Sequence, residues 1–207
     1  IDNTDFYPSK GKERIKSMIE TRPDWCVSRQ RVWGVPLPIF ISKKTGDVLV
    51  DDEVFENIAK IYEKEGSDCW FNEDYQIFLG DKYKAEDYEK LSDIVEVWFD
   101  SGSTHSFVLE KRDDLKWPAS MYLEGSDQHR GWFHSSLLES CGTRGVAPFE
   151  SILSHGFVVD GKGLKMSKST GNVIAPQDIL KKYGADILRI WVASSNYAED
   201  LRIDYSI

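Results

Sequence analysis

The feature that most constrains the fold is an alternation of short apolar segments with helix-like segments in the second half of the chain. Three segments have the length and apolar composition of buried strands: residues 94–99, 120–123 and 152–154. Helical patterns alternate with them at residues 131–140 and 176–183. Because parallel strands need a crossover connection, this order predicts a parallel α/β sheet.

Two further helices are expected at the ends of the chain. Residues 13–22 carry apolar side chains at i, i+3 and i+4 and stop at Pro23, which cannot continue a helix. Residues 186–194 form the second pattern, in which four apolar side chains are expected to face inward: Ile187, Leu188, Ile190 and Trp191. The residues after this helix are expected to form a polar tail.

The middle of the chain differs in composition from the rest. Two apolar segments flank a turn with a glycine, as in a hairpin: residues 35–41 and 48–50 around residues 43–47. Residues 51–93 are acidic and polar, with one helix at residues 53–65 and a tyrosine-rich loop after it. This part of the sequence therefore predicts a small α+β insertion.

Composition sets limits on the whole chain. A chain of 207 residues, 41% of them apolar, can bury one substantial core or two modest ones. Its apolar stretches fall short of the roughly 20 residues that a membrane span needs, so no membrane partner is expected. The net charge of -9 disfavours nonspecific nucleic-acid binding. Three isolated cysteines indicate a reducing compartment, the cytoplasm, and no zinc site.

Residues 161–172 form the segment that carries most chemical information. Glycines surround Lys165 and Lys168, and small hydroxyl residues lie next to both lysines. Such a loop can approach a ligand closely and bring two ammonium groups to a polyphosphate, as phosphoryl chemistry requires. The alternative is a solvated basic loop between a strand and a helix, because runs of charge usually lie at the surface.

Residues 124–128 are a second candidate, because they follow a predicted strand and precede a predicted helix. They therefore lie at the carboxyl edge of the sheet, where α/β folds bind ligands. Gly125 permits close approach of a backbone, and Glu124, Asp127 and Gln128 can bond hydroxyl or ammonium groups. A helix cap with surface acids explains the same residues equally well.

Tryptophans and histidines carry less information when each is taken alone. Trp98 and Trp132 each precede a phenylalanine and, as single aromatics, are more often core than binding pocket. His129 and His134 are five residues apart and share no helical face, so a metal site is not predicted. His105 and His155 are expected to be structural.

Four strings together carry a resemblance to a known family. They are KMSKS at residues 165–169, DWCVSRQRVWGVP at 24–36, VWFDSGSTHS at 97–106 and YLEGSDQHRGWF at 122–133. The first is similar to the signature loop of class I aminoacyl-tRNA synthetases, and the others resemble the isoleucyl branch. The valyl and leucyl branches share the layout and remain an alternative, as does a non-catalytic nucleotide- or RNA-binding module.

The resemblance implies a role for each matching residue. Lys165 and Lys168 would be the catalytic residues, and two tryptophans, Trp98 and Trp132, would wall the amino-acid pocket. ATP and the aminoacyl-adenylate would be bound by three segments: Glu124, Gly125, Asp127 and Gln128; His155, Gly156, Phe157 and Val158; and Lys165, Met166, Ser167, Lys168 and Ser169. No metal ligand is implied.

The resemblance also implies a fold and a domain organisation. The fold would be α/β, the C-terminal half of a Rossmann-like parallel sheet with a small α+β insertion. Residues 1–35 would begin that half and residues 36–93 would be the connective insertion. Residues 94–194 would be the catalytic core half with the signature loop, and residues 195–207 the start of a linker or stem.

The implied activity belongs to a longer enzyme than this chain. That enzyme would be a cytoplasmic monomer that uses ATP and Mg²⁺ to join isoleucine to tRNA(Ile). The first residues lack an initiator methionine and any signal-peptide pattern, so an excised segment is expected. The family's other signature, a histidine motif near the start of its fold, does not occur in these residues, so the isolated chain is expected to be inactive.

Overall fold

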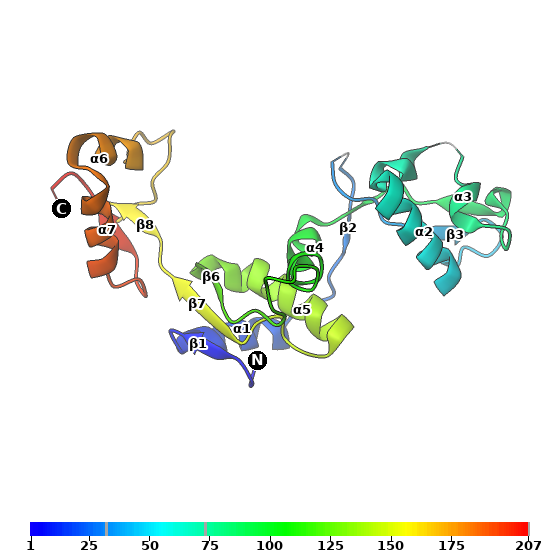
Figure 1. Ribbon diagram of the computed structural model, residues 1–207, viewed down its shortest axis with the longest axis horizontal. Helices are drawn as coiled ribbons and strands as arrows, with labels where there is room; N and C mark the ends of the chain where they lie inside the picture. Colours follow the sequence, from blue (N-terminus) through cyan, green and yellow to red (C-terminus); the bar gives the residue numbers. More distant parts are fainter. Residues whose placement is uncertain (32, 73, 207) are drawn as a thin grey trace. The chain divides into compact units, whose positions relative to one another are not determined.

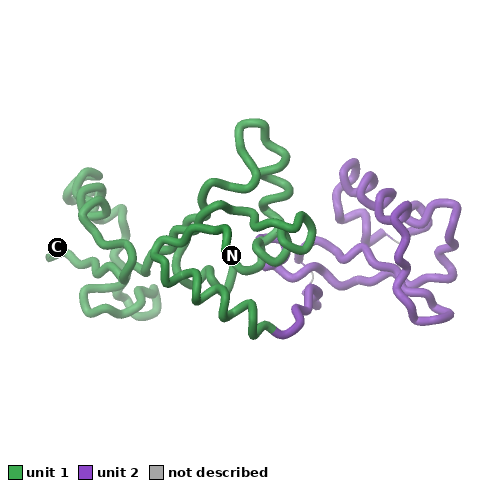
Figure 2. Tube along the Cα trace, turned by 90° about the horizontal axis from the view of Figure 1, so that it is seen from below, with its two compact units in different colours: residues 1–22, 102–207 green, residues 23–101 purple. Residues whose placement is uncertain are grey.

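The computed structural model describes residues 1–31, 33–72 and 74–206. The chain divides into two compact units, coloured separately in Figure 2. Unit 1 joins Ile1–Arg22 to Gly102–Ile207, and unit 2 is Pro23–Ser101. Each unit buries a hydrophobic cluster of its own.

Unit 1 contains a three-stranded parallel sheet, which confirms the predicted sheet type. Its order is β1 (Asp5–Tyr7), β7 (Ser151–His155) and β6 (Tyr122–Gly125), with β7 in the centre (Figure 1). The chain passes from β6 through a 3-10 turn, η4 (Ser126–Arg130), and helix α5 (Trp132–Arg144) before it returns in β7. This β-α-β crossover aligns the carboxyl ends of β6 and β7.

The core of unit 1 lies between this sheet and two helices, α1 (Lys10–Glu20) and α5. It is built from one apolar cluster: Phe6, Ile15, Tyr122, Phe133, Leu137, Phe149 and Ile152. Ile15 and Phe133 are fully buried, and the burial of Ile15 fits the amphipathic pattern that predicted α1. Helix α1 begins three residues earlier than expected and ends before Pro23.

A second strand pair in unit 1 follows β7. Strand β8 (Val158–Asp160) pairs in parallel with β9 (Leu201–Ile203). Between them lie α6 (Pro176–Tyr183), with the bounds predicted from the sequence, and α7 (Ala185–Ser194). The segment expected to be a polar tail therefore contributes a strand.

Unit 2 is a small α+β unit. Strand β3 (Phe40–Ser42) pairs antiparallel with β4 (Tyr88–Lys90), and β2 (Ser28–Arg29) pairs antiparallel with β5 (Ile94–Val95). Among its helices are α2 (Asp52–Glu65), η1 (Ser67–Phe71), α3 (Gln76–Leu79) and η2 (Ala85–Asp87).

Local contacts explain the main elements of unit 2. Helix α2 begins one residue earlier than predicted, where the Asp51 carboxylate caps its first turn by accepting from Glu53 N at 2.9 Å. Its apolar face packs on Trp70, which is fully buried. The expected hairpin turn is present, since Ser42 N donates to Asp47 O at 2.8 Å and Leu49 N to Phe40 O at 2.8 Å.

The predicted strand at residues 94–99 is wrong beyond its first two residues. The chain leaves β5 and forms helix α4 (Val97–Gly102), followed by a π-helical turn, η3 (His105–Leu109). The Glu96 carboxylate accepts from Trp98 N at 2.9 Å and so caps the new helix. This local cap outweighs the strand propensity of the apolar run.

The expected burial of α7 is also wrong. Ile187 is 47% exposed and Ile190 is 64% exposed. Both line an open hollow of about 260 Å³ between α6, α7 and the segment after β9, together with Leu188 and Trp191. The four side chains share one face as predicted, but nothing in the described residues fills the space in front of them.

No helix among the described residues is both long enough and apolar enough to cross a membrane.

Candidate functional site

The carboxyl ends of β6 and β7 bring two predicted segments together. Gly125, at the end of β6, is paired with His155, at the end of β7. A side chain at Gly125 would lie 2.7 Å from Asp127 Oδ1, 3.7 Å from His155 Cε1 and 3.8 Å from Phe157 Cε1. A Cβ here would displace the Asp127 carboxylate, whereas its contacts with His155 and Phe157 would be ordinary van der Waals contacts.

The polar side chains at this edge have different surroundings. Glu124 and Asp127 are exposed, and neither forms a salt bridge with a lysine or arginine of the described residues. The Gln128 side chain is engaged within the protein, since its Oε1 accepts from Trp132 N at 2.8 Å and its Nε2 donates to Asp127 Oδ2 at 3.2 Å. Gln128 thus caps the first turn of α5, and each carboxylate is exposed and has one oxygen that accepts a hydrogen bond within the protein.

The segment from His155 to Val158 is held by the end of the chain. Gly156 N donates to Tyr197 O at 2.9 Å, Phe157 N donates to Asp200 Oδ1 at 2.8 Å, and Leu201 N donates to Phe157 O at 2.8 Å. A side chain at Gly156 would lie 2.3 Å from the main-chain carbon and oxygen of Glu199. Sequence reasoning missed these contacts between residues 156–157 and 197–201. No local pattern predicts a contact between segments about forty residues apart.

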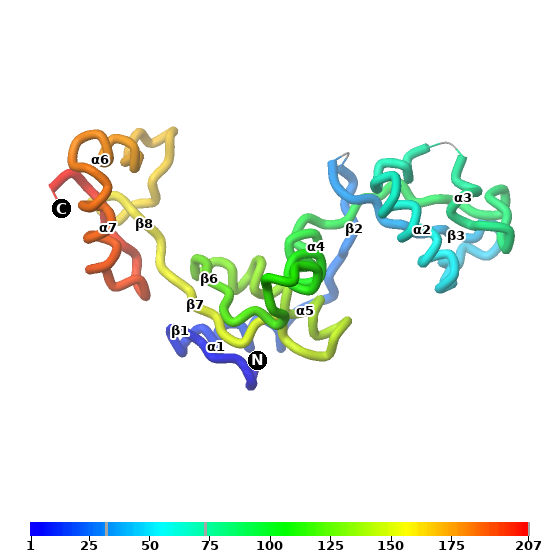
Figure 3. The backbone as a smooth tube through the Cα atoms, viewed as in Figure 1, coloured from blue at the N-terminus to red at the C-terminus, as the bar shows by residue number. Residues whose placement is uncertain are grey.

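After residues 155–158 the chain continues through β8 into residues 161–172, the lysine-bearing loop that carries Lys165 and Lys168 (Figure 3). The base of the loop is a tight hairpin, in which Val159 forms an antiparallel bridge with Lys165 and Asp160 N donates to Leu164 O at 2.9 Å. Gly163 turns the chain with a φ of 82°, in the left-handed region that favours glycine.

The second half of the loop is a separate turn. Gly171 N donates to Ser167 O at 3.2 Å, and Ser167 Oγ lies 2.6 Å from Thr170 Oγ1. Lys165 and Lys168 are exposed, and within the described part of the chain neither lies within salt-bridge distance of a carboxylate. Two ammonium groups without carboxylate partners are suited to an anionic ligand.

Met166, Ser167 and Ser169 also belong to the predicted loop site. Met166 and Ser167 are half-buried and Ser169 is exposed. The Ser167 hydroxyl lies 3.1 Å from that of Ser169 and also accepts from Thr170 N at 3.2 Å. These residues therefore shape the turn, while the two lysines extend from it.

The two predicted pocket tryptophans lie in different units. In unit 1, Trp132 stacks on Tyr122 with ring centroids 4.0 Å apart and planes 3° apart, beside the core. In unit 2, Trp98 is 41% exposed on α4. The motif at residues 24–36 that contributed to the resemblance includes Val32, which lies outside the described residues.

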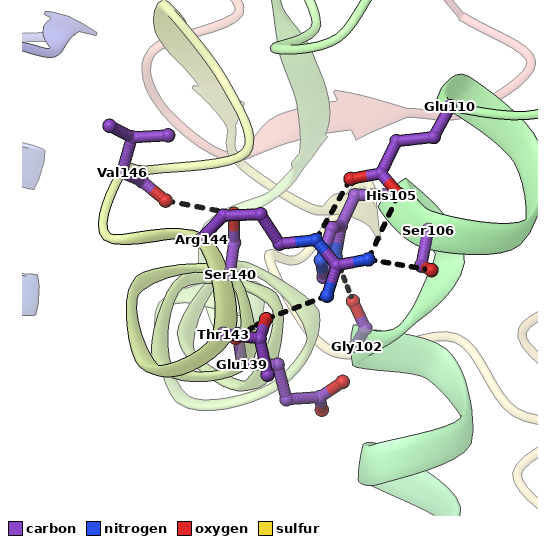
Figure 4. A network of polar contacts seen from close by, with 9 residues as sticks. All are labelled: Gly102, His105, Ser106, Glu110, Glu139, Ser140, Thr143, Arg144 and Val146. Atoms are coloured by element: carbon purple, nitrogen blue, oxygen red, sulfur yellow. Dashed lines mark hydrogen bonds and ion pairs between the residues drawn. The ribbon is translucent and has the colours of Figure 1, made fainter. Parts of the chain in front are cut away.

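Three of the four histidines have structural surroundings: His105, His129 and His134. His105 is buried with Nδ1 2.9 Å from Gly102 O, next to the bidentate pair of Arg144 with Glu110 (Figure 4). Burial lowers the pKa of both His129 and His134, and Arg22 donates to His134 Nε2 at 3.2 Å. No group of three or more His, Cys, Asp or Glu among the described residues could hold a metal ion.

Known proteins resemble this chain in sequence and in fold. The sequence profile of the class I tRNA synthetases for isoleucine, leucine, methionine and valine matches residues 1–204. The chain belongs to this family. Its resemblance to the isoleucyl branch is confirmed, since it is 86% identical over 207 residues to the isoleucine–tRNA ligase of Pelagibacter ubique and 58% identical to that of Zymomonas mobilis.

The chain spans less than a quarter of these relatives, 23% and 22% of their lengths. Solved structures of the family share its fold. A leucyl-tRNA synthetase of Agrobacterium radiobacter, solved with tRNA and LeuAMS, has a TM-score of 0.61 at 18% identity, over 93% of this chain and 28% of its own. Methionyl-tRNA synthetase of Mycobacterium tuberculosis, with methionyl-adenylate, has a TM-score of 0.61 at 18% identity, over 98% of this chain and 31% of its own. The predicted Rossmann-like α/β fold is therefore confirmed.

Proposed function

We propose that this chain is part of an isoleucyl-tRNA synthetase, which activates isoleucine with ATP and transfers it from isoleucyl-adenylate to tRNA(Ile). The observation that carries the proposal is the 86% identity, over the whole chain, with an isoleucine–tRNA ligase. The two exposed lysines on their hydrogen-bonded loop support it, since such groups suit a polyphosphate. We propose the cytoplasm as its location and a monomer as its state.

Lys165 and Lys168 would act on the phosphates. When the isoleucine carboxylate attacks the α-phosphorus of ATP, negative charge grows on the departing pyrophosphate. Ammonium groups placed beside that pyrophosphate stabilise the transition state more than the ground state, which lowers the barrier. The loop holds both lysines outward and without carboxylate partners among the described residues, so no protein ion pair must break first.

The sheet edge would hold the adenylate. The Glu124 and Asp127 carboxylates are open to the ribose hydroxyls and to the amino group of isoleucine. Gln128 would orient the edge through its cap on α5, at 2.8 Å from Trp132 N. Four residues would form the floor beside them: His155, Gly156, Phe157 and Val158. Trp98 and Trp132 would each offer an aromatic face to the isoleucine side chain.

Mg²⁺ would accompany ATP as part of the substrate. The described residues hold no cluster of three or more metal-binding side chains, so they do not fit a resident metal site. Because the chain spans 23% of its relative, and the histidine signature of the family is not among its residues, we expect the isolated chain to be inactive.

The test is amino-acid-dependent exchange of pyrophosphate into ATP by the full-length enzyme that carries this sequence. Isoleucine should support exchange far better than leucine, and better than valine by about 10–200-fold. This factor is the discrimination that an apolar pocket achieves between side chains that differ by one methylene group. Faster exchange with leucine or valine would assign the chain to a sibling enzyme, and no exchange with any of them would refute the proposal.

Lysine variants test the roles of the loop in the same assay. Lys165→Ala and Lys168→Ala should each lower the exchange rate by about 10²–10³-fold, as removal of a transition-state donor does. Lys181→Ala on α6 removes an equally exposed lysine and should leave the rate unchanged. Equal effects of all three changes would contradict the assigned roles.

A further inference from the structure

One asparagine side chain ties the lysine-bearing loop together. Asn172 Nδ2 donates to Asp160 Oδ2 at 2.8 Å and to Lys165 O at 3.2 Å, while Asn172 Oδ1 accepts from Ser167 N at 2.9 Å. Both amide hydrogens and the carbonyl oxygen are used, so only one orientation of the amide satisfies its partners. Asn172 therefore bonds the main chain on both sides of Met166, between the two lysines.

Asp160 completes this arrangement from the other end of the loop. Its Oδ1 accepts from Lys162 N at 2.9 Å and from Leu164 N at 2.8 Å, and its Oδ2 accepts from Asn172. These bonds, the one from Asn172 most of all, lower the pKa of the Asp160 carboxyl. Asp160, just before the loop, is thus hydrogen-bonded to Asn172, the last residue of the loop.

The consequence concerns the lysines themselves. Asp160 and Asn172 together bond four main-chain groups of the loop: the N–H groups of Lys162, Leu164 and Ser167, and the carbonyl of Lys165. The side chains of Lys165 and Lys168 have no such attachment among the described residues. The position of each ammonium group therefore depends on a main chain that these two polar residues hold.

We propose that Asp160 and Asn172 are positioning residues that set the geometry of the signature loop for pyrophosphate departure. The proposal rests on the proposed function, since it assumes that Lys165 and Lys168 meet the phosphates of ATP. Neither residue needs to touch ATP. Their contribution is to keep the loop ordered before ATP arrives, which reduces the entropy that must be lost in the transition state.

The experiment uses the full-length enzyme with changes at the two positions. Asn172→Ala removes all three bonds, and Asn172→Asp puts a second carboxylate against Asp160. The double variant Asp160→Asn with Asn172→Asp exchanges donor and acceptor, so that the amide at position 160 donates to the carboxylate at position 172. It also retains the acceptors for the Leu164 and Ser167 amides, but it loses the donor to Lys165 O.

The expected result has a kinetic and a structural part. Asn172→Ala should lower kcat and kcat/KM for ATP by about tenfold, equally, because an interaction needed in the transition state is lost, while KM for isoleucine stays unchanged. Asn172→Asp should be worse, and the exchanged pair should recover part of the loss, because it restores the bond between positions 160 and 172 but not the bond to Lys165 O. Hydrogen exchange of the Ser167 amide should accelerate in both single variants and slow again in the double variant.

A matched control separates loop geometry from general stability. Asn57→Ala also removes two hydrogen bonds from an asparagine amide, to Ile77 O at 2.7 Å and Phe78 O at 3.0 Å, but in unit 2. It should lower stability without changing the kinetics with ATP. If Asn172→Ala changes the kinetics no more than Asn57→Ala, or if the exchanged pair rescues nothing, the proposal is overturned.

The two proposals fail in different ways. If the unchanged enzyme shows no isoleucine-dependent exchange, the proposed function fails, and exchange of the Ser167 amide still decides whether Asp160 and Asn172 order the loop. If the unchanged enzyme is active and Asn172→Ala is equally active, only the positioning role fails.

Discussion

Gly156 provides the sharpest test of how the candidate site is built. A Cβ at this position would lie 2.3 Å from the carbonyl carbon and oxygen of Glu199 and 2.6 Å from the nitrogen of Asp200. These are main-chain atoms, so no side chain can rotate away to relieve the collision. Gly156→Ala must therefore move the segment at residues 197–201 away from the end of β7.

The free-energy cost of Gly156→Ala can be estimated from the hydrogen bonds between the two segments. Three hydrogen bonds join the two segments: Gly156 N to Tyr197 O at 2.9 Å, Phe157 N to Asp200 Oδ1 at 2.8 Å, and Leu201 N to Phe157 O at 2.8 Å. Inserting a methyl group into a packed site costs about 1–3 kcal/mol, and each lost bond costs about 1 kcal/mol. We expect the contacts between the two segments to be weakened by about 1–3 kcal/mol.

Hydrogen exchange measures the weakening locally. The amide of Leu201 should exchange roughly 5–150-fold faster in Gly156→Ala, the factor that corresponds to about 1–3 kcal/mol. The matched control is Gly142→Ala in α5, where nothing lies within 4 Å of the added Cβ. That change should raise the stability by about 0.5–1 kcal/mol, because alanine favours the helix. Unchanged Leu201 exchange in Gly156→Ala would refute the reasoning.

Three further predictions concern stability. Trp70→Ala should destabilise unit 2 by about 3–5 kcal/mol, measured by urea unfolding, because it empties a fully buried site; a loss under about 1 kcal/mol would contradict this. Arg144→Lys should lower the free energy of unfolding by about 1 kcal/mol, because lysine cannot make the bidentate contact with Glu110. An unchanged thermal unfolding temperature would contradict this. Burial lowers the pKa of His129 and His134 below the ordinary value of 6.5, so below about pH 6.5 the unfolded chain binds more protons than the folded chain. The free energy of unfolding should therefore fall as the pH drops below about 6.5. A rise in the free energy of unfolding would contradict this prediction.

Sequence reasoning succeeded where the determining contacts are local. Helix α2 begins at the Asp51 cap and α6 begins at Pro176, and both starts are visible as residue types at fixed positions. The two lysines of the loop could be named for the same reason, since the loop motif is continuous in the sequence. The roles assigned to them stay predictions until the exchange assay is made.

Sequence reasoning failed where a segment could form either a strand or a helix, and where residues distant in the chain determine whether a side chain is buried. Residues 94–99 satisfy the pattern of a buried strand, yet the Glu96 cap starts a helix at Val97. Ile190 has the spacing of a core residue but remains 64% exposed, because spacing gives the direction of a side chain and not what lies in front of it.

The sequence alone determined the parallel type of the sheet, two of its three strands (β6 and β7), the family resemblance and the position of the two loop lysines. These depend on periodicity, on turn residues and on short continuous motifs. Only the tertiary structure decided that residues 197–201 brace Gly156 and that Asn172 joins Asp160 across the signature loop. Neither contact has a signature in the local sequence, because each depends on how the chain folds back on itself.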